Sequence, residues 1–175
     1  MKKFLALALA LAAALTWGFS AAAGWDPPEG AVNAEAVVLY NVDTDTVVYE
    51  KNSREVRAAA SLTKMMTALL LAESGEDLSA TFTIPEGLSE EFDRIQAENG
   101  SDADLKIGET VTLESLLYAC LLPSGNDAAS AIAYYLGNGD MQAFFDRMNA
   151  RAAELGCENT NFTCAHGLYG LEYGN

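Results

Sequence analysis

The chemistry that this sequence could perform begins with a serine and a lysine separated by two residues. Ser61 and Lys64 open an apolar segment that predicts a helix, and their spacing places both side chains on one helix face. A serine hydroxyl is a weak nucleophile until a base takes its proton, and a buried lysine can be that base. Backbone N–H groups at a helix start could stabilise the oxyanion that forms when a carbonyl is attacked. Alone, the pair is a weak signal, because serine is also a favoured helix cap.

A second polar element follows Lys64 after 60 residues and interrupts two apolar segments. Ser124 and Asn126 come directly after Pro123, in a break from which polar side chains can project into a cleft. Ser124 could relay a proton toward a leaving nitrogen, and Asn126 could bind a substrate amide or hold Lys64 in place. A simple turn, in which Asn126 or Asp127 caps the next helix, would explain the same residues without catalysis.

Together, the two elements match the motif order of the serine penicillin-recognising enzymes, which carry S-x-x-K, then S-x-N, then K-T-G. The sequence resembles the D-alanyl-D-alanine carboxypeptidase branch of that group, the low-molecular-weight penicillin-binding proteins. Residues 59–67, 121–129 and 155–168 carry the resemblance, which covers about residues 31–170. Several ordered motifs at fitting spacing make the resemblance specific.

The resemblance implies a serine-type hydrolase that removes the terminal D-alanine of peptidoglycan stem peptides through an acyl-enzyme on Ser61. Lys64 would accept the proton of Ser61, Ser124 would assist proton transfer to the departing D-alanine, and Asn126 would position the substrate. The implied partners are peptidoglycan pentapeptides and β-lactam inhibitors, and no metal or organic cofactor is implied. The implied fold is the α+β transpeptidase fold of penicillin-binding proteins and β-lactamases, with helices packed on an antiparallel sheet plus a helical lobe.

Three alternatives remain open. A serine β-lactamase or a D,D-endopeptidase of the same fold would use the same residues on a different substrate. An inactive cell-wall-binding fragment is the alternative of another class, because no Lys-Thr-Gly triplet occurs in the sequence. In the family, that triplet binds the substrate carboxylate and supplies an oxyanion donor. We therefore expect a truncated catalytic domain with little or no activity, and membrane contact only through a C-terminal tail outside this sequence.

The N-terminal residues have the composition of a signal peptide over 1–23. A basic start precedes the apolar stretch 4–17, and residues 21–23 offer an A-x-A cleavage site. We expect an exported, extracytoplasmic protein, placed in the periplasm or on the cell-wall side of the membrane. A linker is expected over 24–30, followed by the truncated catalytic domain over 31–175. A retained membrane anchor is the alternative to cleavage.

Composition excludes some classes of function. The 175 residues include 25 acidic and 10 basic side chains, a formal net charge of -15, so nucleic-acid binding is not expected. The three cysteines and one histidine lack the spacing of a zinc site, and we expect no metal centre. Cys120 is expected to be buried, whereas Cys157 and Cys164 could form a disulfide. His166 is expected to be a structural turn residue rather than a catalytic one.

Hydrophobic periodicity predicts the elements that must position these side chains. Two apolar, β-branched segments around a polar turn predict a β-hairpin at 34–41 and 46–50. Met65 and Met66 are expected to pack in a helix core, and the acidic run 86–104 to form a solvated surface. Thr112 and Asp140 are predicted helix N-caps. Helices are predicted over 61–73, 88–97, 113–122, 127–136 and 141–155, and a further strand over 80–84.

Overall fold

The computed structural model describes residues 27–28, 30 and 32–168, which belong to two compact units divided after Glu55. The predicted signal peptide and part of the predicted linker lie outside the described residues, as do residues 169–175. Among the helices that are described, none combines the length and apolar character that a membrane span requires.

The first unit contains the predicted hairpin. β1 (Val37–Asn41) pairs antiparallel with β2 (Thr46–Lys51), and the first strand begins three residues later than predicted. The side chain of Asn41 accepts hydrogen bonds from the backbone N–H groups of Asp43 and Thr44, at 3.0 and 3.1 Å. Such local bonds of an asparagine side chain stabilise a tight turn, so the polar residues between the strands fix the hairpin.

The second unit is mainly helical. All the predicted helices, and the predicted strand at 80–84, are present within two residues of their predicted ends. β3 (Thr81–Thr83), within the predicted strand, pairs antiparallel with β4 (Thr110–Thr112), a short strand that was not predicted. In chain order the elements are the 3-10 turn η1 (Ala60–Leu62), α2 (Thr63–Glu73), β3 (Thr81–Thr83), the 3-10 turn η2 (Glu86–Leu88), α3 (Ser89–Ala97), β4 (Thr110–Thr112), α4 (Leu113–Leu121), α5 (Asn126–Leu136) and α6 (Met141–Glu154).

Side-chain caps define where two of these helices begin. Thr112 accepts a hydrogen bond from the backbone N–H of Ser115 at 3.1 Å at the start of α4. Asp140 accepts from the backbone N–H groups of Gln142 and Ala143 at the start of α6. Both predicted N-caps are confirmed, and each satisfies backbone donors that have no partner within their own helix.

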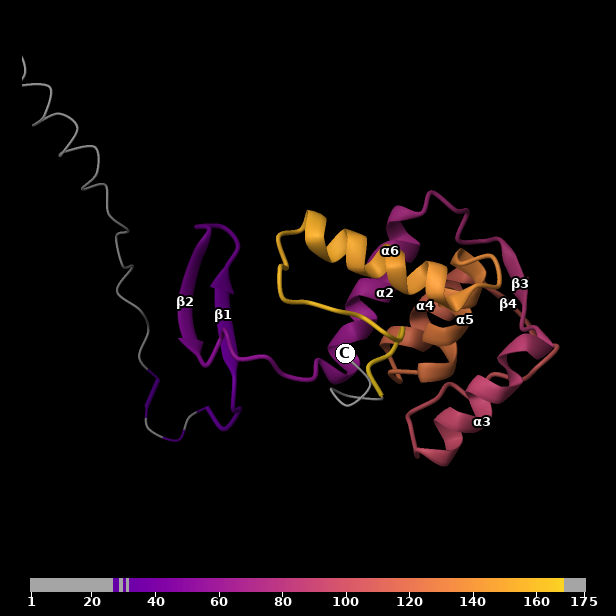
Figure 1. Ribbon diagram of the computed structural model, residues 1–175, viewed down its shortest axis with the longest axis horizontal. Helices are drawn as coiled ribbons and strands as arrows, with labels where there is room; N and C mark the ends of the chain where they lie inside the picture. The colour runs from indigo at the N-terminus through magenta and orange to yellow at the C-terminus, as the bar shows by residue number, and fades with distance from the viewer. Residues whose placement is uncertain (1–26, 29, 31, 169–175) are drawn as a thin grey trace, which may run out of the picture. The chain divides into compact units, whose positions relative to one another are not determined.

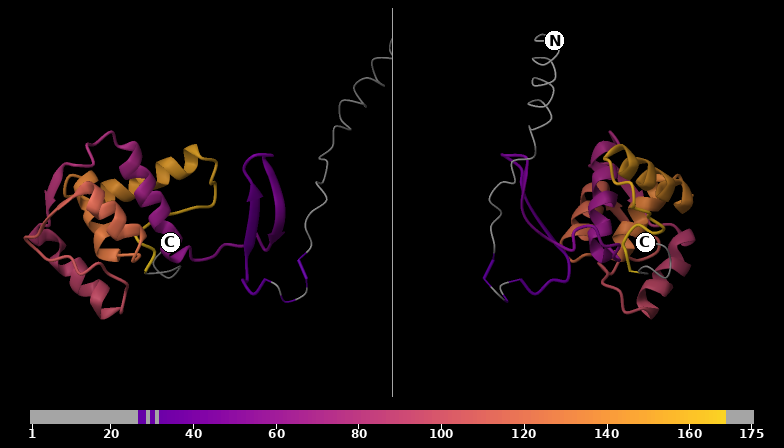
Figure 2. Two further views of the ribbon diagram at one scale, coloured as in Figure 1. Left: turned by 180° about the vertical axis from the view of Figure 1, so that it is seen from behind. Right: turned by 60° about the vertical axis from the view of Figure 1, so that its left-hand side comes forward.

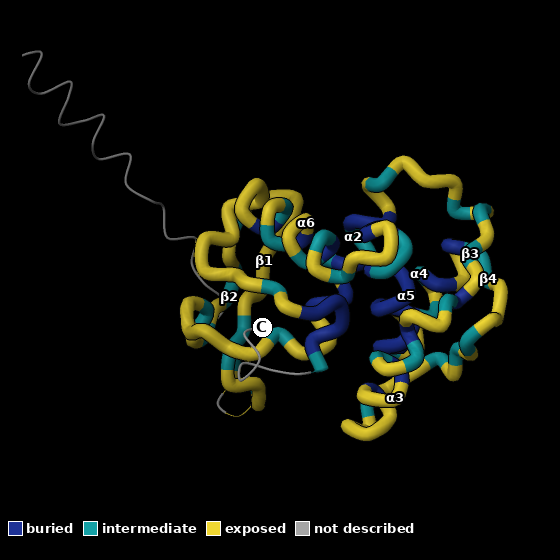
Figure 3. The backbone as a smooth tube through the Cα atoms, turned by 45° about the vertical axis from the view of Figure 1, so that its right-hand side comes forward, coloured by how far each residue is buried: buried dark blue, intermediate teal, exposed yellow. Residues whose placement is uncertain are grey.

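The core of the helical unit lies among α2, α4, α5 and α6, and α5 is buried along most of its length (Figure 3). Its alanines allow neighbouring helices to approach closely, while larger side chains from the other helices fill the space. α3 turns Phe92 and Ile95 inward and exposes most of its acidic residues, which agrees with the solvated surface expected there. Fully buried large side chains include Leu71, Leu113, Leu116, Ile132, Phe144 and Met148.

The two adjacent methionines of α2 differ from the prediction that both pack in the core. Met66 packs against the core, but Met65 is 66% exposed. Consecutive residues project about 100° apart around a helix axis, so one core-facing stripe does not accommodate both. Met65 instead faces a surface pocket beside the start of α2.

Candidate active site

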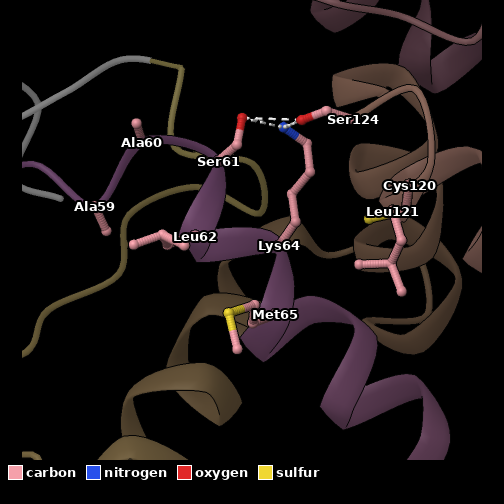
Figure 4. Close-up of a pocket in the computed structure, with 9 residues that line it drawn as sticks. All are labelled: Ala59, Ala60, Ser61, Leu62, Lys64, Met65, Cys120, Leu121 and Ser124. Atoms are coloured by element: carbon pink, nitrogen blue, oxygen red, sulfur yellow. Dashed lines mark hydrogen bonds between the residues drawn. The ribbon is translucent and has the colours of Figure 1, made fainter. Parts of the chain in front are cut away.

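Three side chains that the sequence singled out meet at this pocket. Lys64 Nζ donates hydrogen bonds to Ser61 Oγ at 3.1 Å and to Ser124 Oγ at 3.2 Å. Ser124 Oγ in turn donates to Ser61 Oγ at 3.0 Å, which closes a triangle of polar groups (Figure 4). A cavity of about 370 Å³ opens beside them, and its lining includes the apolar side chains of Leu62, Met65, Cys120 and Leu121.

Two strained turns present the serines. Ser61 lies in the 3-10 turn that precedes α2, so the helix does not open at Ser61 as predicted but at Thr63. Ala60 and Ser124 both adopt left-handed backbone conformations, with φ of 47° and 60°. A residue with a Cβ atom is sterically strained in the left-handed region, and residues strained in this way are concentrated at functional sites. Periodicity in the sequence carries no signal for this strain.

The amine of Lys64 is enclosed by acceptors. The side chain is 2% exposed, and besides the two hydroxyls it donates to the backbone carbonyl of His166 at 3.2 Å. An ammonium group has three N–H donors, and the structure provides three acceptors for them. Burial lowers the pKa of Lys64 below its usual value, because desolvation disfavours the charged amine. Lys64 therefore loses its proton more easily than an exposed lysine, which gives the neutral amine that a general base requires.

Asn126, the fourth predicted site residue, is the first residue of α5 and is not among the residues that line the cavity. It is 3% exposed, and its backbone N–H donates to Ser101 O at 2.8 Å. A Cβ atom placed on Gly100 would come within 2.6 Å of its Nδ2 atom, so the amide packs against the Gly100 backbone. The structure thus brings Ser61, Lys64 and Ser124 together, whereas the side chain of Asn126 lies outside this hydrogen-bonded group and packs against Gly100.

Asp127, which the sequence suggested only as a helix cap, also holds a neighbouring segment in position. Its carboxylate accepts hydrogen bonds from the backbone N–H groups of Ala103 and Leu105, at 2.9 and 3.0 Å. These bonds attach the segment before β4 to the start of α5, next to the turn that carries Ser124. A carboxylate at a helix N-terminus is also favoured by the helix dipole.

No disulfide joins the described cysteines, so Cys157 and Cys164 do not form the bridge that the sequence left open. Cys120 is buried as predicted, and burial raises the pKa of its thiol to about 11. Burial also opposes ionisation of Cys164, but its hydrogen bond to the His166 side chain and its hydrogen bonds to the backbone of His166 and Gly167 lower the pKa of Cys164 to about 7. His166 is buried and contacts Glu91, which agrees with a structural role.

An α+β chain in which a Ser-x-x-Lys and a Ser-x-Asn element share one pocket has the arrangement of the serine penicillin-recognising enzymes. The family described as D-alanyl-D-alanine carboxypeptidase matches residues 22–172 of this sequence. The chain belongs to the D-alanyl-D-alanine carboxypeptidase family.

Several curated relatives have the same description. A D-alanyl-D-alanine carboxypeptidase of Streptomyces sp. is 39% identical over 166 residues, which cover 91% of this chain and 55% of the relative. The carboxypeptidase DacF of Bacillus subtilis is 35% identical and aligns with 96% of this chain and 43% of its own length. A D-alanyl-D-alanine endopeptidase of Escherichia coli is 28% identical, over 76% of this chain and 41% of the relative. The chain thus spans about half the length of the curated relatives it matches.

Solved structures confirm the predicted fold. A variant of a Streptomyces DD-transpeptidase matches with a TM-score of 0.71 and 37% identity, covering 78% of this chain and 54% of the other. The D-alanyl-D-alanine carboxypeptidase DacD of Francisella tularensis matches with a TM-score of 0.66 and 32% identity, over 88% of this chain and 36% of the other. The penicillin-binding-protein-like transpeptidase fold was therefore correctly inferred from the motifs.

Proposed function

We propose that this chain carries the nucleophile half of a serine-type D-Ala-D-Ala carboxypeptidase active site. Its substrate is the terminal D-Ala-D-Ala of peptidoglycan pentapeptides, and Ser61 is the acyl-accepting nucleophile. The observation that supports this proposal is the hydrogen-bonded triangle of Ser61, Lys64 and Ser124 beside an open cavity. Membership of the carboxypeptidase family favours this substrate over other peptides.

The proton path follows from the distances in the triangle. The neutral amine of Lys64, 3.1 Å from Ser61 Oγ, takes the hydroxyl proton as the oxygen attacks the carbonyl of the penultimate D-alanine. The backbone N–H of Ser61 stabilises the resulting oxyanion. Ser124 Oγ contacts both groups and passes a proton to the nitrogen of the departing D-alanine as the C–N bond breaks. Lys64 then gives its proton back to Ser124. Water attacks the ester, Lys64 takes one proton from the water, and that proton passes to Ser61 Oγ as the acyl bond breaks, so all three groups return to their starting states.

The remaining groups serve recognition. Asn126, the first residue of α5 and two residues after Ser124, is assigned to the substrate amide, which its side-chain amide can bind as donor and acceptor. β-Lactams react with the same serine because their ring amide resembles the D-Ala-D-Ala bond, and the opened ring stays attached to the protein. The substrate carboxylate requires a cation, which the family supplies from the Lys-Thr-Gly triplet; this triplet is not among the 175 residues.

A D,D-endopeptidase is the second candidate, because one similar relative is named D-alanyl-D-alanine endopeptidase. The same triangle would then cleave cross-links between stem peptides instead of terminal residues. Incubation with pentapeptide and with cross-linked muropeptides separates the two reactions, since only the carboxypeptidase releases free D-alanine. Rapid turnover of penicillin, without a lasting acyl-enzyme, would instead indicate a β-lactamase.

Covalent labelling tests the nucleophile. The gene product that carries this sequence is incubated with a fluorescent penicillin and the label is followed on a denaturing gel. We expect Ser61→Ala to abolish the label, while Ser79→Ala, at an exposed serine outside the pocket, keeps it. Label that survives Ser61→Ala would remove the assignment of the nucleophile, and no label on the wild type would favour the inactive cell-wall-binding alternative.

We further propose that the protein is exported, with residues 1–23 as a cleaved leader, 24–30 as a linker and 31–175 as part of the catalytic domain. The support is the basic, apolar and small-residue order of the leader and the cell-wall substrate that the family implies. Mass spectrometry of the exported protein should find Gly24 as the first residue. A cytoplasmic protein that retains Met1 would contradict the proposal.

A further inference from the structure

A buried polar pair lies outside the catalytic triangle and has no part in the proton path described above. His166 Nε2 is 3.1 Å from Glu91 Oε1, and the imidazole is fully enclosed. His166 Nδ1 accepts the backbone N–H of Leu168 at 3.0 Å, which assigns a proton to Nε2 and makes it the donor to Glu91. The imidazole is therefore fixed on both of its nitrogens.

Two further side chains contact the carboxylate of Glu91. Ser130 on α5 donates to Glu91 Oε1 at 3.2 Å, and Arg94 on α3 donates to Glu91 Oε2 at 2.6 Å. The carboxylate is 15% exposed, whereas Arg94 is 58% exposed and lies at the surface. The pair thus joins α3, α5 and the segment 164–168 at one buried point.

The same segment carries a contact to the catalytic lysine. The carbonyl of His166 accepts a hydrogen bond from Lys64 Nζ at 3.2 Å, and the carbonyl of Ala165 accepts one from Thr67 Oγ1 at 2.6 Å. The segment, which follows α6 in the chain, lies beside the first turns of α2 (Figure 2). The segment is therefore anchored by the hydrogen bond of the His166 imidazole to Glu91 and contacts Lys64 through the His166 carbonyl.

The carbonyl contact decides how the neutral amine is oriented. A neutral amine has two N–H donors and one lone pair, whereas a hydroxyl can donate or accept. A carbonyl can only accept, so the His166 oxygen must take one N–H of Lys64. The lone pair and the second N–H are then left for Ser61 and Ser124, which is the arrangement needed to receive the Ser61 proton.

We propose that His166 and Glu91 are positioning residues: the Glu91–His166 hydrogen bond holds the His166 carbonyl on Lys64 and thereby aims the lone pair of Lys64 at Ser61. This inference rests on the proposed function of Ser61 and Lys64. Neither His166 nor Glu91 is among the residues that line the cavity. A displacement of about 1 Å in such a contact can reduce a reaction rate by up to about a hundredfold.

Variants of Glu91 test this proposal, because they change the hydrogen bond in graded steps. Glu91→Ala removes the acceptor, Glu91→Asp withdraws it by one methylene, and Glu91→Gln keeps an acceptor oxygen at the same reach without the charge. Arg94→Ala is the matched control, since it removes a surface ion pair of the same carboxylate and leaves His166 untouched. Two measurements are made on each: β-lactam acylation of the gene product, resolved into reagent binding and the acylation rate constant, and amide exchange of Gly167 and Leu168.

We expect Glu91→Ala and Glu91→Asp to lower the acylation rate constant by about tenfold or more with unchanged reagent binding, and to speed amide exchange at Gly167 and Leu168. Glu91→Gln and Arg94→Ala should stay within about threefold of the wild type in both measurements. If Glu91→Ala does not fold, the comparison of Glu91→Asp with Glu91→Gln decides.

Equal rates in Glu91→Ala and the wild type would overturn the proposal, as would an equal loss in Glu91→Gln. A wild-type protein that is never acylated would count against the proposed function alone. In that case amide exchange, which needs no activity, still tests whether Glu91 holds the segment: unchanged exchange in Glu91→Ala and Glu91→Asp would overturn the inference.

Discussion

At the scale of single residues, the environment of Lys64 distinguishes this Ser-x-x-Lys pair from one that occurs by chance. A helix start with these residues at the surface would leave the lysine charged and solvated. Here the side chain is 2% exposed and its Nζ atom has three acceptors from three separate parts of the chain. Burial lowers the pKa of Lys64, which is the property that a lysine needs to act as a general base.

The pH dependence of acylation follows from that shift. The base is active as the neutral amine, so the acylation rate should rise with pH and level off above the pKa of Lys64. Because burial lowers this pKa, the midpoint should lie below 10.5, the ordinary value for lysine. Stopped-flow measurement of β-lactam acylation across pH checks this, with Lys64→Arg, which stays protonated, as the inactive control. A midpoint at or above 10.5 would argue against Lys64 as the base.

At the scale of elements, the site depends on the close contact between the segment 164–168 and the turn before α2. Gly167 has a φ of 78°, and a Cβ atom there would overlap the carbonyl oxygen of Ala60 and lie 2.6 Å from Thr63 Oγ1. Ala60 directly precedes Ser61, so this glycine permits the approach that lets His166 reach Lys64. The glycine therefore has a steric role in addition to its conformational one.

Gly167→Ala should consequently destabilise the protein and disturb the site. We expect a loss of at least about 2 kcal/mol in the free energy of unfolding, because backbone strain and overlap add, together with slower acylation. Gly108→Ala is the matched control: its φ is 83°, but nothing lies within 4 Å of the added Cβ. Urea unfolding of both variants measures the difference. An equal loss in the two would show that the contact with Ala60 is unimportant.

At the scale of the whole molecule, the pocket rests on a helical core. Ser61 lies in the 3-10 turn before α2, Lys64 in the first turn of α2, and Ser124 in the turn between α4 and α5 (Figures 1 and 4). These helices pack on one another through buried side chains such as Leu71, Leu116 and Ile132. A site assembled from residues 60 positions apart exists only while this packing holds α2 and the turn together.

Truncation of a core side chain should therefore cost much more than truncation of the same residue at the surface. Leu116→Ala, at a fully buried position, should lower the free energy of unfolding by about 2–5 kcal/mol. Leu122→Ala, at a position that is 78% exposed, should change it by no more than about 0.5 kcal/mol. Urea titration followed by circular dichroism compares the two, and similar losses would contradict the assignment of the core.

The sequence by itself determined the family, the helices and the residues of the candidate site. Ser61, Lys64 and Ser124 were recognisable because their residue types and order fit one chemistry, and the helices because apolar residues recur at a period that reflects local geometry. Thr112 and Asp140 were recognisable as N-caps because each directly precedes a segment with helical periodicity. Each of these inferences depends on residues that are close in sequence or on a motif order.

Only the tertiary structure decided which groups touch. Glu91 and His166 are 75 residues apart, and neither lies in a motif that predicts the other. The close approach of Gly167 to Ala60 and the packing of the Asn126 amide against Gly100 likewise bring together residues that are far apart in the sequence. Local patterns report the interactions within a helix or strand, whereas these contacts depend on how the elements pack, which no local pattern encodes.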